Sequence, residues 1–170
     1  MRGASSFDWE SLLIGQAVPR AKRRWLLAAH SAALRVARAF DRSGLAGALG
    51  AMDRITAHRE ARRALAALPA EMRTFLAQEV VWQTRGLVRT FYGERLCLFE
   101  ALATTAALRA LGLPAAVIVG YATGSGARRT PVHAWAALDG IPVTDSGYVW
   151  QRYTEITRYP HERKGVSCAG

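Results

Sequence analysis

The chain has 170 residues, enough for one domain with a substantial core, and 51% of them are apolar. Lysine and arginine outnumber aspartate and glutamate by 23 to 13, which gives a formal net charge of +10. The arginines are spread from Arg2 to Arg163, without the clustered footprint or recognisable module that nucleic-acid binding requires. The composition therefore argues against a nucleic-acid-binding protein and favours a cationic surface that attracts acidic peptides or partners.

The sequence predicts neither a signal peptide nor a membrane span. Residues Met1 to Gly15 lack the cationic-then-apolar layout of a signal peptide. The apolar run from Trp25 to Phe40 is interrupted by basic residues, which makes it too short and too charged to cross a bilayer. We therefore expect a cytoplasmic protein. The alternative for the basic helix over residues 20–42 is that it lies on a membrane surface instead of packing on the core.

The two cysteines, Cys97 and Cys168, provide no disulfide framework. A bridge between them is disfavoured if the protein is cytoplasmic.

Helical periodicity dominates roughly the first ninety residues. Helices are predicted from about Pro19 to Asp41, from Leu45 to Leu68 and from Pro69 to Phe91, with a break at Ser43-Gly44. We expect residues 1–92 to form a helical region packed on a catalytic core of residues 93–160, followed by a frayed tail over 161–170. The whole chain is expected to form one compact domain.

The second half of the chain predicts one helix that leads into a small sheet. The helix covers Leu96 to Leu111 and ends at Gly112-Leu113-Pro114. Strands are expected at Ala115–Tyr121, Val132–Leu138 and Ile141–Asp145, with a mobile loop over Thr123–Thr130, an Asp139-Gly140 turn, and Tyr153, Ile156 and Tyr159 packing back on the core. The predicted fold class is α+β, with the helix packed against a small antiparallel sheet.

Three residues in this half have the side chains of an activated cysteine nucleophile. Cys97 lies at the start of the helix, His133 on a strand and Asp145 on the next strand. The N-terminus of a helix stabilises a thiolate, and the Cys97 backbone N–H can supply half of an oxyanion hole. Taken alone, each residue is more typical of a structural role, Cys97 as a buried thiol and His133 as an ordinary strand histidine, and the functional interpretation depends on their combination.

Two aspartates compete for the third role. Asp139 is half of a hairpin-turn pair and is expected to point to water. Asp145 shares the face of His133 and Trp135 if the loop has three residues, whereas a two-residue loop places it on the other face. The sequence leaves this register open, and we favour Asp145.

Other candidates are weaker on the sequence alone. Gln83 falls in the apolar stripe of the third predicted helix, so its amide is a candidate second oxyanion donor or a structural glutamine. Tyr121 and Trp135 are candidate substrate-binding residues. A zinc site from Cys97, His133 and Asp145 lacks a further Cys or His at ligand spacing, so we expect no metal and no cofactor.

The sequence around these residues resembles the transglutaminase-like family. The resemblance is carried over about residues 93–146 by Cys97-Leu98-Phe99-Glu100-Ala101-Leu102-Ala103, Leu111-Gly112-Leu113-Pro114-Ala115, Val117-Ile118-Val119-Gly120, and His133-Ala134-Trp135 with Asp145. Within that family the sequence is most similar to the leader peptidases of lasso-peptide biosynthesis, the "B" proteins. This resemblance implies a papain-like Cys–His–Asp protease that removes the leader peptide from a ribosomally made precursor.

The resemblance also implies partners. The protease passes the core peptide to an ATP-dependent macrolactam synthetase, and some relatives carry a fused leader-recognition domain with β-strands. Because no strands are predicted in the first half of this chain, it looks like the stand-alone protease of the split systems, which works with a separate leader-recognition protein.

Two other functions remain open. The same triad supports acyl transfer to an amine, as in true transglutaminases. The chain is alternatively a non-catalytic scaffold that binds a peptide or the synthetase, although a scaffold has no chemical need for all three side chains.

Overall fold

A computed structural model describes residues 21–123 and 131–160. The helices and strands, in chain order, are α2 (Arg23–Asp53), α3 (Arg59–Ala66), α4 (Ala70–Tyr92), α5 (Cys97–Ala110), β1 (Ala115–Ala122), β2 (Val132–Leu138), β3 (Ile141–Pro142), α6 (Val149–Arg152) and β4 (Tyr153–Tyr159). The expected loop over Thr123–Thr130 and the tail from residue 161 fall largely or wholly outside the described residues, as does Cys168. A helical first half followed by a small antiparallel sheet confirms the predicted α+β class.

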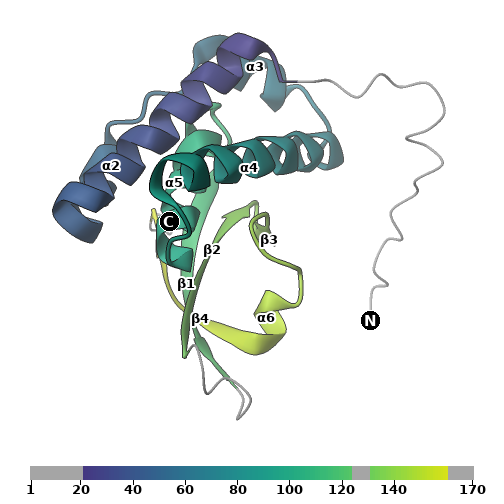
Figure 1. Cartoon of the computed structure of the whole chain (residues 1–170). Helices are drawn as coiled ribbons and strands as arrows, with labels where there is room; N and C mark the ends of the chain where they lie inside the picture. Colours follow the sequence, from purple (N-terminus) through teal and green to yellow (C-terminus); the bar gives the residue numbers. More distant parts are fainter. Residues whose placement is uncertain (1–20, 124–130, 161–170) are drawn as a thin grey trace, which may run out of the picture.

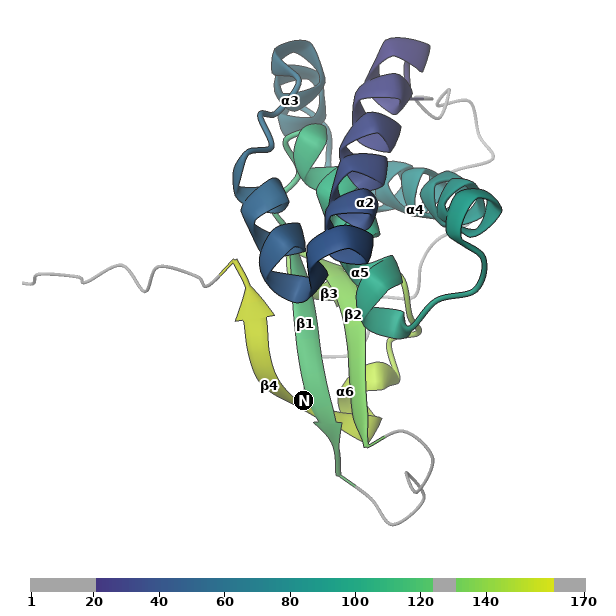
Figure 2. The ribbon, with the colours of Figure 1, turned by 60° about the vertical axis from the view of Figure 1, so that its left-hand side comes forward.

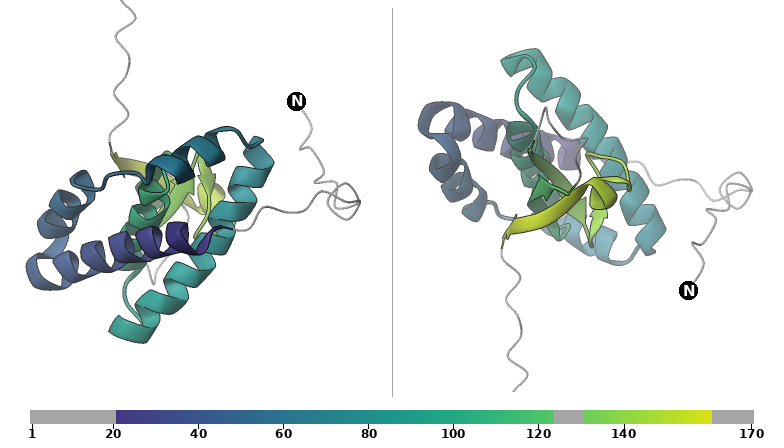
Figure 3. Two further views of the ribbon diagram at one scale, coloured as in Figure 1. Left: turned by 90° about the horizontal axis from the view of Figure 1, so that it is seen from above. Right: turned by 90° about the horizontal axis from the view of Figure 1, so that it is seen from below.

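Helix α5 lies at the centre of the molecule (Figures 1 and 2). Its sequence is almost entirely apolar, and ten of its residues are buried: Phe99, Ala101–Ala107 in an unbroken run, Leu108 and Ala110. A helix that is apolar on all sides must be covered on all sides. One side of α5 packs on β1 and β2, and α2 and α4 cover the rest, as the view from above shows (Figure 3).

The four strands form one antiparallel sheet in the order β3-β2-β1-β4. Alternation along β2 gives the sheet two different faces. Ala134 and Ala136 belong to the large core under the helices, whereas Trp135 packs with Ile118, Val149 and Tyr153 on the face that α6 covers. The sheet is therefore apolar on both sides.

The helical half differs from the sequence-based prediction in one place. The expected break at Ser43-Gly44 is present as a kink within α2, where Gly44 has a φ of 62°. The single helix predicted from Leu45 to Leu68 is wrong, because α2 ends at Asp53 and α3 begins at Arg59. His58 starts α3, since its Nδ1 accepts a hydrogen bond from the Ala61 N–H at 3.3 Å and its own N–H donates to the Ala110 carbonyl at 2.7 Å. The second of these contacts is tertiary and leaves no local pattern in the sequence.

The C-terminal strand β4 was not predicted as a strand. It pairs with β1 at the edge of the sheet, with a shift in register between Val119 and Gly120. The Tyr159 hydroxyl donates to Asp53 at the end of α2, and burial, followed by this hydrogen bond, raises the pKa of Tyr159 to about 12. Tyr159 thus ties the edge strand β4 to the helical half.

Candidate active site

Cys97 is the first residue of α5, as the sequence predicts. The N-cap residue is Leu96, which provides no side-chain hydrogen bond to the helix start. The Leu96 carbonyl accepts from the N–H groups of Phe99 and Glu100. Within the described part of the chain, the N–H groups of Cys97 and Leu98 have no backbone acceptor, so two donors are available next to the thiol.

The thiol of Cys97 is free and half-buried. It packs against the core cluster that includes Val36, Ala101 and Ala134, on the helix-covered side of the sheet. A half-buried thiol at a helix start has both access to a substrate and a positive local potential.

His133 and Asp145 form a hydrogen-bonded pair, with 2.6 Å between Nε2 and Oδ2. The other carboxylate oxygen, Oδ1, accepts from the Ser146 N–H at 2.8 Å. An ionised carboxylate only accepts hydrogen bonds, so Nε2 carries the proton of a neutral imidazole. Nδ1 is then the nitrogen left to accept a proton.

Aromatic rings fix the plane of the His133 imidazole. Trp135 stacks on it at 5.9 Å between centroids, and Tyr153 lies at 5.1 Å. Gly120, the partner of His133 across the β1–β2 pair, makes room for these rings, because a Cβ there would lie 2.8 Å from the Trp135 ring. Trp135 itself is 0% exposed. The expectation that Trp135 contacts substrate is therefore wrong for this structure, since its ring supports the imidazole from below the surface.

The two aspartates occupy different places. Asp139 lies in the turn with a φ of 50°, where it pairs with Arg73 at 3.5 Å. The loop has two residues, because Leu138 pairs with Ile141, and a regular strand would then have put Asp145 on the face away from His133. The strand instead ends at Pro142 and the chain bends over residues 143–145. This bend, which the sequence did not reveal, brings Asp145 to the imidazole.

The thiol and the imidazole approach β2 from different sides. His133 shares the face of Trp135, whereas Cys97 packs on the side of Ala134. No hydrogen bond joins Cys97 to His133 among the described residues. The segment after β3 passes around the edge of β2 from one side to the other. Val143 packs in the core under the helices, and two residues later Asp145 reaches His133.

Arg85 on α4 links these two halves of the site. Its Nε donates to Glu100 Oε2 at 3.0 Å, and its Nη1 donates to the Thr144 carbonyl at 3.3 Å. Glu100 lies one helical turn after Cys97, and Thr144 directly precedes Asp145. Arg89 adds a second guanidinium on Glu100, with 2.8 Å between Nε and Oε1, and this hydrogen bond raises the pKa of Arg89.

Arg85 and Glu100 were not identified as site residues from the sequence. Glu100 lies within the sequence motif around Cys97, so that motif could have identified it as a candidate site residue. Nothing in the sequence connects Arg85 with Thr144, because this contact spans 59 residues.

Two further candidate site residues, Gln83 and Tyr121, differ in their surroundings. The Gln83 amide nitrogen donates to Glu79 Oε1 at 3.2 Å, one turn earlier on α4, and no hydrogen bond among the described residues joins it to Cys97. Tyr121 is 55% exposed and lies opposite Val132 in the β1–β2 pair, so its ring is accessible to a ligand at this end of the sheet.

Within residues 21–123 and 131–160, no group of three or more His, Cys, Asp or Glu side chains is arranged to hold a metal ion. No helix in the same ranges is long and apolar enough to span a membrane.

Comparison with known families gives one match. The family described as Transglutaminase-like superfamily matches residues 11–158, which include Cys97, His133 and Asp145. Searches of curated proteins and of solved structures found no match to the chain.

Proposed function

Because the chain belongs to the transglutaminase-like superfamily, we propose that it is a cysteine endopeptidase with Cys97 as nucleophile, His133 as general base and Asp145 as the residue that orients His133. The superfamily supports cysteine protease or acyltransferase chemistry in general. The observation that supports the three roles best is the 2.6 Å pair between His133 Nε2 and Asp145 Oδ2, which leaves Nδ1 free to take a proton from the thiol.

The proposed reaction has two stages. His133 Nδ1 removes the proton from Cys97 Sγ, the thiolate attacks the peptide carbonyl carbon, and the carbonyl oxygen becomes negatively charged. The N–H groups of Cys97 and Leu98 are the donors for this oxyanion. The C–N bond then breaks as His133 returns the proton to the leaving amine, and water hydrolyses the thioester with His133 again acting as base.

The thiol and Nδ1 must come into contact for this reaction. They are not hydrogen-bonded to each other here, and catalytic hydrogen bonds often tighten only when substrate binds. The edge of β2 is the place for this approach, since His133 and Asp145 are both partly exposed there, at 22% and 34% of their side chains.

The proposed substrate is a peptide, and specifically the leader region of a lasso-peptide precursor. The resemblance over residues 93–146 supports the second part of this proposal. Exposed apolar side chains near both halves of the site support the first, since an extended chain can lie across them: Leu96, Tyr121, Val132 and Tyr148. Precursor, recognition protein and macrolactam synthetase are the proposed partners, and cleavage precedes ring formation.

The first prediction tests the nucleophile. Cys97→Ala should abolish cleavage of the precursor, because the thiolate is lost, and should leave the circular dichroism spectrum unchanged, because alanine is a good helix former. Mass spectrometry of the precursor, with its recognition protein present, measures the released leader. Substantial residual cleavage would rule out Cys97 as the nucleophile.

A second candidate function is acyl transfer to an amine, which needs the same three residues. The two functions differ in product mass. With an added primary amine, a transferase gives an amide product in which the amine replaces water, whereas a peptidase gives a free carboxylate. A non-catalytic scaffold would give neither product.

A further inference from the structure

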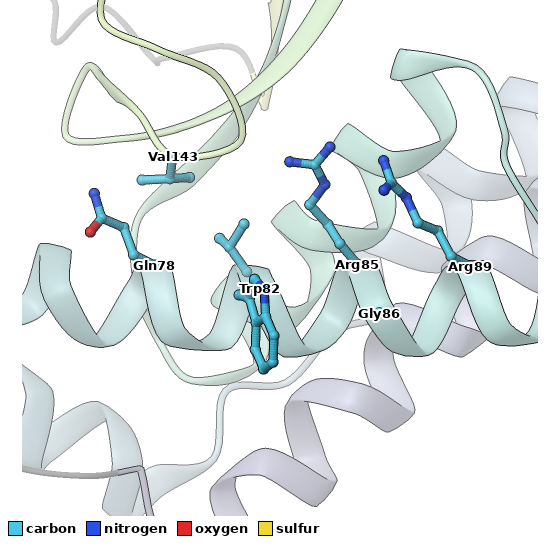
Figure 4. A pocket seen from close by; sticks show the side chains of 7 residues that line it. Gln78, Trp82, Arg85, Gly86, Arg89 and Val143 are labelled. Carbon is cyan, nitrogen blue, oxygen red and sulfur yellow. The ribbon is translucent and has the colours of Figure 1, made fainter.

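A pocket of about 480 Å³ lies along α4 beside the segment that follows β3. The residues that line it are Gln78, Val81, Trp82, Arg85, Arg89 and Val143, with Gly86 between the arginines. Figure 4 shows the guanidinium groups of Arg85 and Arg89 extending from α4 on the side of Val143. The pocket combines two cationic groups with an apolar lining.

The residues that line the pocket carry a net positive charge, since two of them are arginines and none is acidic. Two guanidinium groups share one carboxylate, that of Glu100, whose side chain is only 11% exposed. Arg85 uses Nε and Nη1 for its contacts, and Arg89 uses Nε and Nη2. Within the described residues, Nη2 of Arg85 and Nη1 of Arg89 have no acceptor, so each can donate to a ligand oxygen.

Apart from the Gln78 amide, the remaining lining is apolar and suits a hydrocarbon chain. Val81 and Val143 are buried at 4% and 8% exposure, whereas Trp82 is 78% exposed on the surface of α4. Gly86 has no side chain, and a Cβ added there would meet nothing within 4 Å. The space beside the arginines is therefore open.

The pocket is also connected to the candidate active site. Arg85 donates to the Thr144 carbonyl, and the next residue, Asp145, holds His133. Val143, in the pocket wall, belongs to the same short segment. The pocket and the His133–Asp145 pair therefore share one short segment of the chain, residues 143–145.

We propose that this pocket is a substrate subsite that binds an aspartate or glutamate side chain of the peptide near the bond to be cut. The carboxylate accepts hydrogen bonds from the free amino groups of Arg85 and Arg89, and the methylene groups pack on Val81 and Val143. Charge complementarity distinguishes this occupant from a basic or neutral side chain. The proposal deepens the peptidase function and rests on it for the identity of the ligand as a peptide substrate.

The test measures binding without cleavage. An array of twelve-residue peptides, each made in a form with glutamate and an isosteric form with glutamine, is probed with the full-length chain carrying Cys97→Ala. Among the peptides that bind, we expect the form with glutamate to be retained about tenfold better than the form with glutamine. This is the difference expected for a charge-assisted hydrogen bond. In this background, Arg89→Gln removes one donor, and Gly86→Leu obstructs the pocket without changing its charge. Each should reduce the preference to about twofold or less.

Two control variants separate the pocket from the overall positive charge. Arg63→Gln removes the same charge from an exposed position on α3, and Phe91→Ala removes an exposed aromatic ring from α4 outside the pocket. Both should keep the tenfold preference. Absence of binding, absence of a glutamate preference, or an equal loss in Arg63→Gln would overturn the proposal. None of these results depends on the thiol, so failure of the peptidase function would appear separately, as a parent chain with an intact Cys97 that releases no leader from the precursor.

Discussion

At the residue scale, Asp145 and Asp139 offer a matched pair of carboxylates. Asp145→Asn should lower kcat by about 100-fold or more, because an amide can hold the imidazole in the wrong tautomer. Asp139→Asn should change kcat little, since its pair with Arg73 is long and partly exposed and asparagine tolerates a φ of 50°. Steady-state kinetics on one peptide substrate compares the two. If Asp139→Asn were inactive and Asp145→Asn active, Asp139 instead of Asp145 would be the residue that orients His133.

Arg85 is a positioning residue by its contacts, since it joins the helix of Cys97 to the segment of Asp145. Arg85→Gln should lower kcat about tenfold even for peptides without a carboxylate, because Thr144 and Asp145 lose their anchor to Glu100. Glu100 keeps Arg89 as a partner, so the fold should survive.

Three readouts separate positioning from a general loss of stability in Arg85→Gln. Arg85→Lys should not restore kcat, because an ammonium does not reproduce both contacts. Added methylguanidine should restore part of it. An unchanged melting temperature with unchanged kcat would show that the link has no catalytic role.

The residues of the candidate site were predictable to the extent that their chemistry is local. A cysteine at a helix start and a histidine on a strand followed from residue type and pattern. The pairing of Asp145 with His133 depended on the bend after Pro142, which reverses the face that a two-residue loop would give. The role of Arg85 was not predictable, because it depends on a contact with Thr144, 59 residues away. No pattern in one sequence indicates such a contact.

At the scale of the helix, two glycines should respond in opposite ways to alanine. Gly86→Ala in α4 should raise stability by about 0.5–1 kcal/mol, because the added Cβ meets nothing within 4 Å and alanine favours the helix. Gly112→Ala after α5 should lower stability by about 1–2 kcal/mol or more. Its φ is 84°, and the new Cβ would lie 2.5 Å from Arg62 Cγ.

Thermal unfolding of the two glycine variants, monitored by circular dichroism, provides the measurement. A melting temperature for Gly86→Ala at or below that of the parent chain would contradict the reading of Gly86 as an unconstrained helix position. A stable Gly112→Ala would show that Arg62 and the helix end can move apart.

The elements differ in how far their sequences define them. Helix α5 and strands β1 and β2 are long apolar segments, and their predicted bounds lie within one residue of the observed ones at each end. Strand β4 is a half-exposed edge strand with polar residues at Thr154, Glu155, Thr157 and Arg158, so it lacks the apolar signal of a buried strand. Its formation depends on β1 offering a free edge, which is a property of the assembled sheet.

At the scale of the whole molecule, the described chain before β1 consists of helices and loops without a strand. That part of the chain therefore provides no sheet edge for capturing a leader peptide by strand addition. The layered arrangement places these helices over α5, where they complete the core that positions Cys97. The formal net charge of +10 gives the molecule a long-range attraction for acidic partners.

The last prediction follows from this combination of a strand-free helical layer and a large positive charge. The protein alone should cleave the precursor poorly, and adding the cognate recognition protein should increase kcat/KM by about 100-fold, because tethering the leader raises the effective concentration of the scissile bond. Raising the salt concentration from about 0.1 M to 1 M should remove most of this gain, since screening shortens the reach of surface charges from about 10 Å to 3 Å. Cleavage assays over a salt series, with and without the partner, measure both effects.

Two outcomes would contradict this prediction. If the partner left the rate of the isolated protein unchanged, dependence on a separate recognition protein would be refuted. If the gain persisted at about 1 M salt, apolar contacts would hold the partner instead.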